Sequence, residues 1–308
     1  MDFLSPAQDP ATVDADWACA RYETLRHLLP QADFPARSAH VADLSAMFER
    51  FDGFILDAYG VLNVGAQAIP GAVARIAQMR AAGKAVVVLT NGAAHARRTA
   101  LAKYASLGFD FTAAEVVASR DVAAERLAQA GPDFLWAAIA GPGAGFDDLP
   151  VRVTPLLGND GLLERADGFV FLGSDGWSAA RNAALSAALC ARPRPVIIAN
   201  PDIVAPNEDG FSLEPGHFAA DLPGRSEYFG KPHGPAFEAA CARITAQHPI
   251  PRHRIAMVGD TLHTDVLGGR AAGFGTVLIA GHGLFRGHDP ARFIAASGIV
   301  PDVIAQTT

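Results

Sequence analysis

The stretch FILDAYGVL, residues 54–62, decides the fold of this chain. An apolar run ends abruptly in the carboxylate of Asp57, and a glycine turn at Gly60 precedes two further apolar residues. A strand that is buried on both faces has such an uninterrupted apolar pattern. We therefore interpret Asp57 as a carboxylate that a buried strand presents at the end of a sheet.

Two other apolar runs also end in polar residues. Residues 85–89, AVVVL, lead into Thr90-Asn91-Gly92, and residues 254–259, RIAMVG, lead into Asp260. Helices are expected around these strands at 70–82, 94–107 and 235–247. This alternation is typical of an α/β fold with a parallel sheet covered on both faces. Ligands of such sheets bind beyond the carboxyl ends of the strands, so we expect these polar residues and Asp57 to share one site.

A second α/β pattern fills the middle of the chain. Its expected strands and helix are at 134–139, 168–173, 195–199 and 178–191. The glycine-rich segment 141–145 could hold a phosphate at a helix N-terminus, but a plain turn is favoured over a dinucleotide site, because the G-x-G-x-x-G spacing and a downstream acidic partner are missing. We predict a discontinuous core domain, residues 1–120 and 225–308, with an inserted domain of residues 121–224.

Residues 1–50 form a leader to the core. Apolar positions recur at helical spacing from 14 to 29, where Pro30 ends the pattern, and a second short helix is expected at 41–48. We find no chemistry in this leader and expect it to pack on the outside of the core.

The composition excludes several classes of protein. Half of the 308 residues are hydrophobic, so the chain can bury a sizeable core. The net charge of −7 argues against a nucleic-acid surface. The three cysteines lack zinc or redox spacing, the N-terminus lacks a signal-peptide pattern, and no apolar run is long enough to cross a membrane. We therefore expect a cytoplasmic protein with no membrane or nucleic-acid partner.

The polar residues at the strand ends suit phosphoryl transfer. Asp57, Asp260 and Asp265 offer oxygen ligands of the kind that Mg²⁺ prefers. Carboxylates this close would repel one another unless a cation or Lys231 offset their charge. The hydroxyl and backbone N–H groups at 90–92 can hold phosphoryl oxygens. Together these groups predict a nucleophile, a metal site, a phosphate cradle and a lysine clamp.

The ordered set of motifs resembles that of the haloacid dehalogenase-like hydrolase superfamily. Within it, the chain resembles the class IIA subgroup, which includes nitrophenylphosphatase-like and sugar-phosphate phosphatases. The motifs are DAYGVL at 57–62, LTN at 89–91, GKP at 230–232 and GDTLHTD at 259–265, with NPD at 200–202 resembling a hallmark of that subgroup's cap. The resemblance covers residues 51–308, in the right order and spacing.

The resemblance implies a Rossmann-like core with an inserted α/β cap of the C2 type. It also implies a Mg²⁺-dependent hydrolase that acts on a small phosphorylated metabolite through an aspartyl-phosphate, and a homodimer through the cap is a further expectation. By position, the resemblance implies that Asp57 attacks phosphorus. The transferred group would be bound by Thr90, Asn91 and Gly92, with Lys231 offsetting its charge. Asp260 would ligate Mg²⁺, and Asp265 would either ligate the same ion or support one of its ligands.

Tyr59 departs from the pattern of the family. Phosphatases of this family usually carry a second Asp two residues after the nucleophile, which protonates the leaving group and then activates water. The backbone carbonyl of Tyr59 can still ligate Mg²⁺, but a phenol with a pKa near 10 is a poor base at neutral pH. Losing general acid–base help typically costs ~10²–10⁴-fold in rate. Asp175, Asp202 and His217 of the inserted domain are candidates to supply it.

Two alternative functions stay open on the sequence. Asp-x-Tyr-Gly also resembles the motif of the 2-haloacid dehalogenases, which break carbon–halogen bonds without metal and carry a helical cap between the first two motifs. Here too few residues separate Tyr59 from the next strand to hold a cap. The other alternative is a slow or non-catalytic protein that binds a phosphorylated ligand. We rank a phosphatase first.

Overall fold

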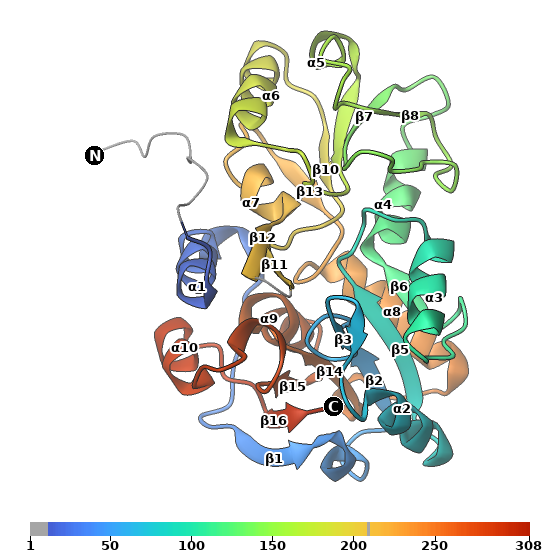
Figure 1. The fold of residues 1–308 in the computed structure, drawn as a ribbon, viewed down its shortest axis with the longest axis vertical. Helices are drawn as coiled ribbons and strands as arrows, with labels where there is room; N and C mark the ends of the chain where they lie inside the picture. Colours follow the sequence, from blue (N-terminus) through green and yellow to red (C-terminus); the bar gives the residue numbers. More distant parts are fainter. Residues whose placement is uncertain (1–11, 208–209) are drawn as a thin grey trace.

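Two parallel sheets organise the computed structural model, which describes residues 12–207 and 210–308 (Figure 1). The core sheet has seven strands in the order β1-β16-β15-β14-β2-β5-β6, and the cap sheet has five in the order β13-β10-β9-β7-β8. All neighbouring strands within each of these sheets run parallel. The predicted α/β core with a separate inserted α/β domain is confirmed.

The core strands carry the apolar runs of the sequence. They are β1 (Ala39–Asp43), β2 (Gly53–Leu56), β5 (Ala85–Thr90), β6 (Val116–Ala118), β14 (Ile255–Gly259), β15 (Gly275–Ile279) and β16 (Val303–Thr307). The core helices are α2 (Ala72–Ala81), α3 (Arg97–Ser106), α4 (Ser119–Ala128), α8 (Gly234–Gln247), α9 (Leu267–Ala271) and α10 (Pro290–Ser297). Two short strands, β3 (Asn63–Val64) and β4 (Gln67–Ala68), follow the Asp57 turn as a hairpin.

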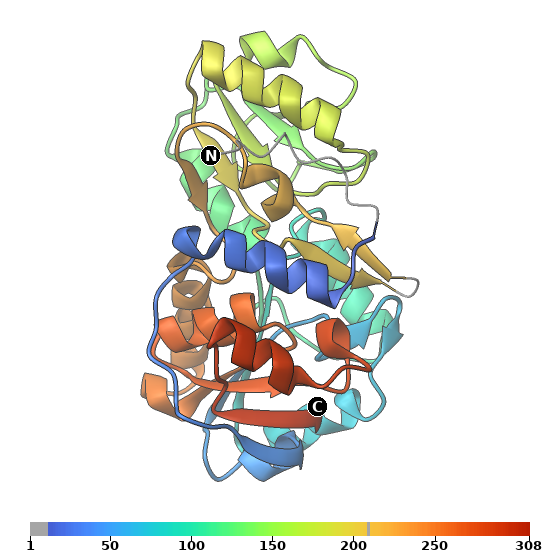
Figure 2. The same ribbon diagram turned by 90° about the vertical axis from the view of Figure 1, so that its left-hand side faces the viewer.

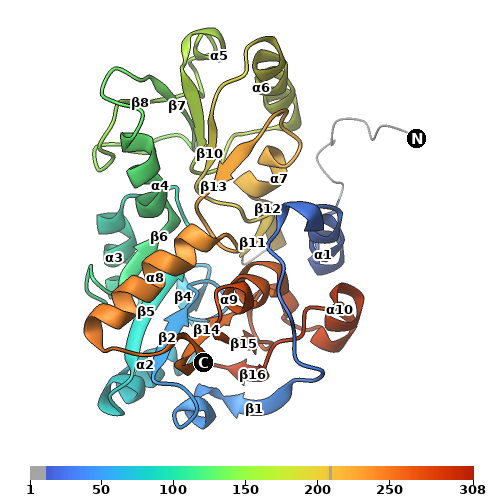
Figure 3. The same cartoon turned by 180° about the vertical axis from the view of Figure 1, so that it is seen from behind.

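Side chains of the central strands alternate between two apolar layers. Val86 and Val88 of β5 belong to the apolar layer on the α2 side of the sheet, whereas Val87 and Leu89 pack with Phe237 of α8 on the other side. Figure 3 shows α8 lying across the core sheet near β5. The period of two residues in a strand sends successive side chains to opposite faces. Every residue of β5 is buried for this reason, so the continuous apolar run marks a strand with helices on both faces.

The cap is a smaller copy of the same architecture. Its strands are β7 (Trp136–Ile139), β8 (Val153–Pro155), β9 (Gly168–Phe171), β10 (Val196–Ile198) and β13 (Ser226–Tyr228). Its helices are α5 (Leu162–Arg165), α6 (Ala179–Ala191) and α7 (Pro215–Ala219). The antiparallel pair β11 (Val204–Asn207) and β12 (Gly210–Leu213) lies between the two sheets (Figure 1). Because β13 pairs with β10, we propose that the cap ends near Tyr228 rather than at the expected residue 224.

The leader differs from its prediction in one element. The expected helix at 41–48 is wrong: residues 39–43 form the edge strand β1, and only Leu44–Met47 form a 3₁₀ turn. β1 pairs with β16, a strand at the far end of the chain that was not expected either. A short, half-exposed strand has only a weak alternation of apolar and polar residues. Its structure therefore depends on pairing with a strand that is distant in the sequence.

Helix α1 (Ala15–Thr24) lies between the cap and the core (Figure 2). Asp14 caps it by accepting a hydrogen bond from the Trp17 N–H. The Tyr22 hydroxyl accepts a hydrogen bond from the backbone N–H of Ile203, just after the NPD motif, at 3.1 Å. The predicted helix is confirmed, and it contacts both domains. None of the helices formed by residues 12–207 and 210–308 has the length and apolar character needed to cross a bilayer.

The side chain of Arg120 joins the core to the cap. It is fully buried on α4 and makes a two-pronged ion pair with Asp148 at 2.9 and 2.6 Å. It also donates to the carbonyls of Ala93, in the core, and Gly145, in the cap. One guanidinium therefore satisfies acceptors from two domains.

The Arg120→Met variant should lower the free energy of unfolding by about 3 kcal/mol, because it leaves Asp148 and two carbonyls without their donor. Urea denaturation followed by circular dichroism measures the change. The matched control is Arg252→Met, which removes an exposed pair with Glu238 and should cost less than about 1 kcal/mol. Equal costs for the two variants would contradict this role of Arg120.

Candidate active site

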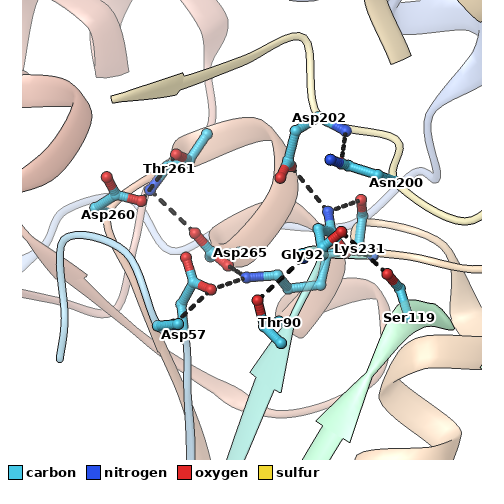
Figure 4. A network of polar contacts seen from close by, with 12 residues as sticks. Asp57, Thr90, Gly92, Ser119, Asn200, Asp202, Lys231, Asp260, Thr261 and Asp265 are labelled. Carbon is cyan, nitrogen blue, oxygen red and sulfur yellow. Dashed lines mark hydrogen bonds and ion pairs between the residues drawn. The ribbon is translucent and has the colours of Figure 1, made fainter. Parts of the chain in front are cut away.

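The predicted site residues meet at the carboxyl end of the core sheet (Figure 4). Asp57 follows β2, Thr90 ends β5 and Asp260 follows β14, and these three strands are neighbours in the sheet. Lys231 reaches the same point from the loop between β13 and α8, and Asp265 from a π-helical turn after β14. Adjacent parallel strands bring their ends together, which is why residues some two hundred positions apart converge.

Lys231 lies between two carboxylates. Its Nζ is 2.7 Å from Asp57 Oδ1 and 2.7 Å from Asp265 Oδ1. All three side chains are buried, and Lys231 is only 2% exposed. Asp260 adds a third buried carboxylate, and one oxygen of each acid lies within 4.8 Å of the others. One lysine therefore faces three acids.

The charges at this point are not balanced. Burial raises the pKa of Asp57 to about 6, with Lys231 opposing and Asp265 adding to the rise. Burial, with the charges of Asp57 and Asp265, raises the pKa of Asp260 well above its ordinary value. Burial lowers the pKa of Lys231, but the two acids it contacts outweigh this and raise it. An excess of oxygen ligands and negative charge is what a hard divalent cation requires, so these residues fit Mg²⁺.

Hydrogen bonds within the acidic loop and from the segment after β15 hold its two carboxylates. Asp260 accepts hydrogen bonds from the Thr261 hydroxyl at 3.0 Å and from the Leu284 N–H at 2.8 Å. Asp265 accepts from the Thr261 N–H at 3.1 Å. Gly259 is required here, because a Cβ at this position would overlap the Asp265 side chain. The spacing of the GDTLHTD motif therefore allows a tight turn and also brings the carboxylates of Asp260 and Asp265 close together.

In the predicted phosphate-binding turn, residues 90–92, the Asn91 side chain is already bound within the protein. The Thr90 hydroxyl accepts a hydrogen bond from the Gly92 N–H at 3.0 Å, which shapes the turn. The Asn91 amide donates to the carbonyl of Lys231 at 2.9 Å and to Asp202 Oδ1 at 2.8 Å, and it accepts from the Lys231 N–H at 2.7 Å. The Asn91 side chain therefore holds Lys231 and the NPD motif of the cap in place.

Tyr59 is a poor candidate for a base at neutral pH. Its half-buried ring packs under Lys103, whose Nζ is 4.6 Å from the ring centroid. Burial raises its pKa, and the charges of Glu214 and Asp57 raise it further. The phenol stays protonated at neutral pH and offers no base. It lines a cavity of about 340 Å³ together with Asp57.

His263 lies inside the acidic motif but contacts helix α1. It lies in the acidic loop, yet its ring turns away from the carboxylates and stacks on Tyr22 of α1 at 4.8 Å. Its Nε2 is 2.6 Å from a Glu23 carboxylate oxygen. The leader therefore braces the back of the metal-binding loop, a contact that no sequence motif indicates.

Two family models match the chain. The model described as "Haloacid dehalogenase-like hydrolase" matches residues 54–145, and one described as HAD-hydrolase-like matches residues 228–306. Chronophin from Homo sapiens is 32% identical over 253 residues, which cover 77% of this chain and 83% of that protein. Glycerol-3-phosphate phosphatase from Gallus gallus is 29% identical over 290 residues, covering 83% and 89%.

The chain belongs to the haloacid dehalogenase-like hydrolases. Its α/β cap, inserted after β6, places it in class IIA of this family with a C2-type cap. It is an enzyme, a phosphatase of the haloacid dehalogenase type.

Solved structures share this fold. A possible sugar phosphatase from Cytophaga hutchinsonii superposes with a TM-score of 0.77 at 25% identity, covering 88% of this chain and 98% of that one. Glycerol phosphate phosphatase from Mycobacterium tuberculosis, solved with magnesium, superposes with a TM-score of 0.65 at 24% identity, covering 84% and 75%. The second match concerns the fold alone.

The cap of this haloacid dehalogenase-like hydrolase contributes two acids to the site. Asp202, a candidate from the sequence, lines the Asp57 cavity, and burial raises its pKa to about 8, with Lys231 opposing. Glu214 also lines this cavity, and burial raises its pKa to about 7. Glu214 was missed because nothing in its local sequence marks it. Asp175 lies in a neighbouring cavity, whereas His217 packs against Trp17 of α1 and lines neither of these cavities.

Asp202 makes the metal-free protein less stable as pH rises. Its pKa in the folded state lies above the ordinary value near 4. The protonated carboxyl therefore makes its full contribution to the free energy of unfolding below about pH 4, and this contribution is lost as pH rises through about 8. The Asp202→Asn variant keeps an acceptor for Asn91 and should gain stability over the parent by up to about 1.4 kcal/mol per pH unit in this window. Urea denaturation in EDTA at pH 5, 6.5 and 8 measures it.

The exposed Asp133→Asn change is the matched control and should follow the parent at each pH. If the free energies of unfolding of Asp202→Asn and the parent differed by the same amount at every pH, the burial of an ionisable group at this position would be contradicted.

Proposed function

We propose that this enzyme is a Mg²⁺-dependent phosphatase that transfers the phosphoryl group of a small phosphorylated metabolite to Asp57 and then to water. The contact that carries the proposal is the buried Lys231 ammonium between Asp57 and Asp265. It leaves Asp57 in the lining of a cavity, beside the groups that would hold a metal and a phosphate.

The metal would be held by Asp57, Asp260 and Asp265, with the backbone carbonyl of Tyr59 as a further ligand. The carboxylate oxygens of these three residues already lie close together, and the positive charge beside them is too small to balance their negative charge. When bound, Mg²⁺ supplies charge neutralisation for the carboxylates and the phosphoryl oxygens. The magnesium in the related Mycobacterium tuberculosis phosphatase supports this choice of ion.

The chain's own residues supply the remaining steps. Asp57 Oδ1 accepts hydrogen bonds from Lys231 Nζ and from the Ala58 N–H at 2.7 Å, which fixes the carboxylate for attack on phosphorus. The Thr90 hydroxyl and the backbone N–H groups of residues 90–92 receive the phosphoryl oxygens, and Lys231 offsets the charge that develops on them. The P–O bond to the leaving alcohol breaks as the bond to Asp57 forms, and hydrolysis of the acyl phosphate restores Asp57.

Tyr59 favours a second candidate, a slow enzyme or a binder of phosphorylated ligands. The steps above require a proton for the leaving alcohol and a base for water, and the protonated phenol supplies no base. Metal-independent carbon–halogen hydrolysis has less support, because only β3, β4 and α2 separate the first two motifs and no cap lies there.

The Asp57→Asn variant should lose phosphate release from p-nitrophenyl phosphate by at least about 10³-fold, because it removes the nucleophile. EDTA should abolish release by the parent enzyme, and added Mg²⁺ should restore it. A colorimetric phosphate assay measures both effects. Halide release from a 2-haloacid in EDTA would overturn the proposal, and thermal stabilisation by phosphate without turnover would point to the binder.

The Tyr59→Asp variant should raise kcat for the same substrate about 10- to 100-fold, because it introduces a carboxyl two residues after the nucleophile. The Tyr59→Phe variant is the matched control, since it removes the hydroxyl without supplying a carboxyl, and it should show no such gain. An equal rise in both variants would mean that loss of the phenol, and not acid–base help, changes the rate.

A further inference from the structure

The acidic loop contains a π-helical turn, Leu262–Val266, that faces helix α1. The Val266 N–H donates to the carbonyl of Thr261, five residues earlier, at 3.3 Å. Turns of this kind are rare and occur mostly at functional sites. This one places the Asp265 carboxylate beside the other acids and the His263 ring against α1. The same short turn therefore carries a proposed metal ligand and a contact with the leader.

Two residues of α1 hold the His263 ring. The ring stacks on Tyr22 with 4.8 Å between the centroids and 5° between the planes. Its Nε2 is 2.6 Å from Glu23 Oε1, and because a carboxylate can only accept, this nitrogen carries a proton and donates it. The buried Nδ1 of the ring has no hydrogen-bond partner among the described residues. The stack and the Glu23 hydrogen bond therefore fix the orientation of the ring.

Apolar packing also joins α1 to the acidic loop. Both elements contribute to one cluster of buried side chains, each at most 2% exposed: Ala15, Ala18 and Tyr22 of α1, and Leu262 and Val266 of the loop. A shift of the loop relative to α1 would open a void in this packing, which close-packed interiors resist. The position of the loop therefore depends on that of α1.

Helix α1 is itself anchored on both domains (Figure 2). Arg21 forms an ion pair with Asp221 of the cap at 2.7 Å, and Asp16 forms one with Arg292 of α10 at 2.9 Å. The Tyr22 hydroxyl accepts a hydrogen bond from the backbone that follows the NPD motif. The base on which the acidic loop rests is therefore fixed at several points along the helix.

We propose that Tyr22 and Glu23 are positioning residues that set the affinity of the site for Mg²⁺. By holding His263, they keep the carboxylates of Asp260 and Asp265 close together. Removing a group that supports metal ligands from behind typically weakens metal binding about 10- to 100-fold. The inference rests on the proposed function, which calls for the metal, and it adds a role for a helix that lies outside both matched family models.

Isothermal titration calorimetry of the metal-free full chain with Mg²⁺, without substrate, measures this affinity. The Glu23→Leu variant should raise the Kd for Mg²⁺ about tenfold, because His263 loses its hydrogen-bond acceptor. The Glu23→Gln variant should stay within about threefold of the parent, because its amide oxygen still accepts from Nε2. Both variants remove the negative charge of Glu23 and its 3.5 Å pair with Arg26, so the comparison isolates the positioning effect.

The Glu23 side chain is 38% exposed, so its variants are expected to fold, and thermal melts check this. Tyr22→Leu removes the stack and should also raise the Kd about tenfold, whereas Tyr22→Phe keeps the ring and should raise it less. If Tyr22→Leu does not fold, the two Glu23 variants decide the question. The matched control is Asp16→Asn, which breaks an exposed ion pair of the same helix and should keep the parent Kd.

The same variants separate metal binding from chemistry. Glu23 does not line the Asp57 cavity, so Glu23→Leu should recover most of the parent kcat for p-nitrophenyl phosphate at saturating Mg²⁺. The Mg²⁺ concentration that gives half-maximal activity should rise about tenfold, in step with the Kd. A large loss of kcat that Mg²⁺ does not restore would contradict a role through metal affinity.

The two possible failures are distinguishable. If the parent binds Mg²⁺ and a folded Glu23→Leu variant binds it equally well, or if Glu23→Leu and Glu23→Gln lose the same affinity, the positioning role is overturned and the proposed function stands. If the parent itself binds no Mg²⁺ and releases no phosphate with it, the proposed function fails and the inference fails with it.

Discussion

The buried contact of Lys231 with Asp57 and Asp265 is the constraint on which the rest of the structure depends. A lysine that is 2% exposed has to be paired, and its partners come from different strand ends of the core sheet. Asn91 holds the backbone of Lys231 from a third strand and reaches Asp202 of the NPD motif. Asp57, the acidic loop and the exit from the cap therefore take their positions from one network.

This network holds more carboxylates than cations, and the proposed binding of a metal ion follows from that excess. Burial raises the pKa of Asp57 and of Asp260, and neighbouring carboxylates add to the rise, so the charged forms are destabilised until a cation joins them. The family uses this arrangement for phosphoryl transfer. In this chain Tyr59 stands where the family usually carries an acid–base carboxyl, so the proposed hydrolysis of an acyl phosphate would need acid–base help from another part of the site.

The two parallel sheets face each other with their carboxyl ends, and the space between them is where sheets of this kind bind ligands. Arg120 joins core and cap through carbonyls of both domains, and α1 contacts the cap at Ile203 and the acidic loop at His263. The N-terminal leader is thus part of the support of the site. Its contacts explain why a segment without motifs lies at the boundary of the domains.

The sequence by itself determined the α/β class, the family and the residues at the strand ends, because Asp57, Thr90 and Asp260 each follow an uninterrupted apolar run. These signals are local, and parallel strands must bring their ends together. Only the tertiary structure decided the rest: the pairing of β1 with β16, the work of Asn91 in holding Lys231, and the entry of Glu214 into the cavity. Such features depend on contacts between segments distant in the chain, and burial by those contacts, rather than residue type, sets their chemistry.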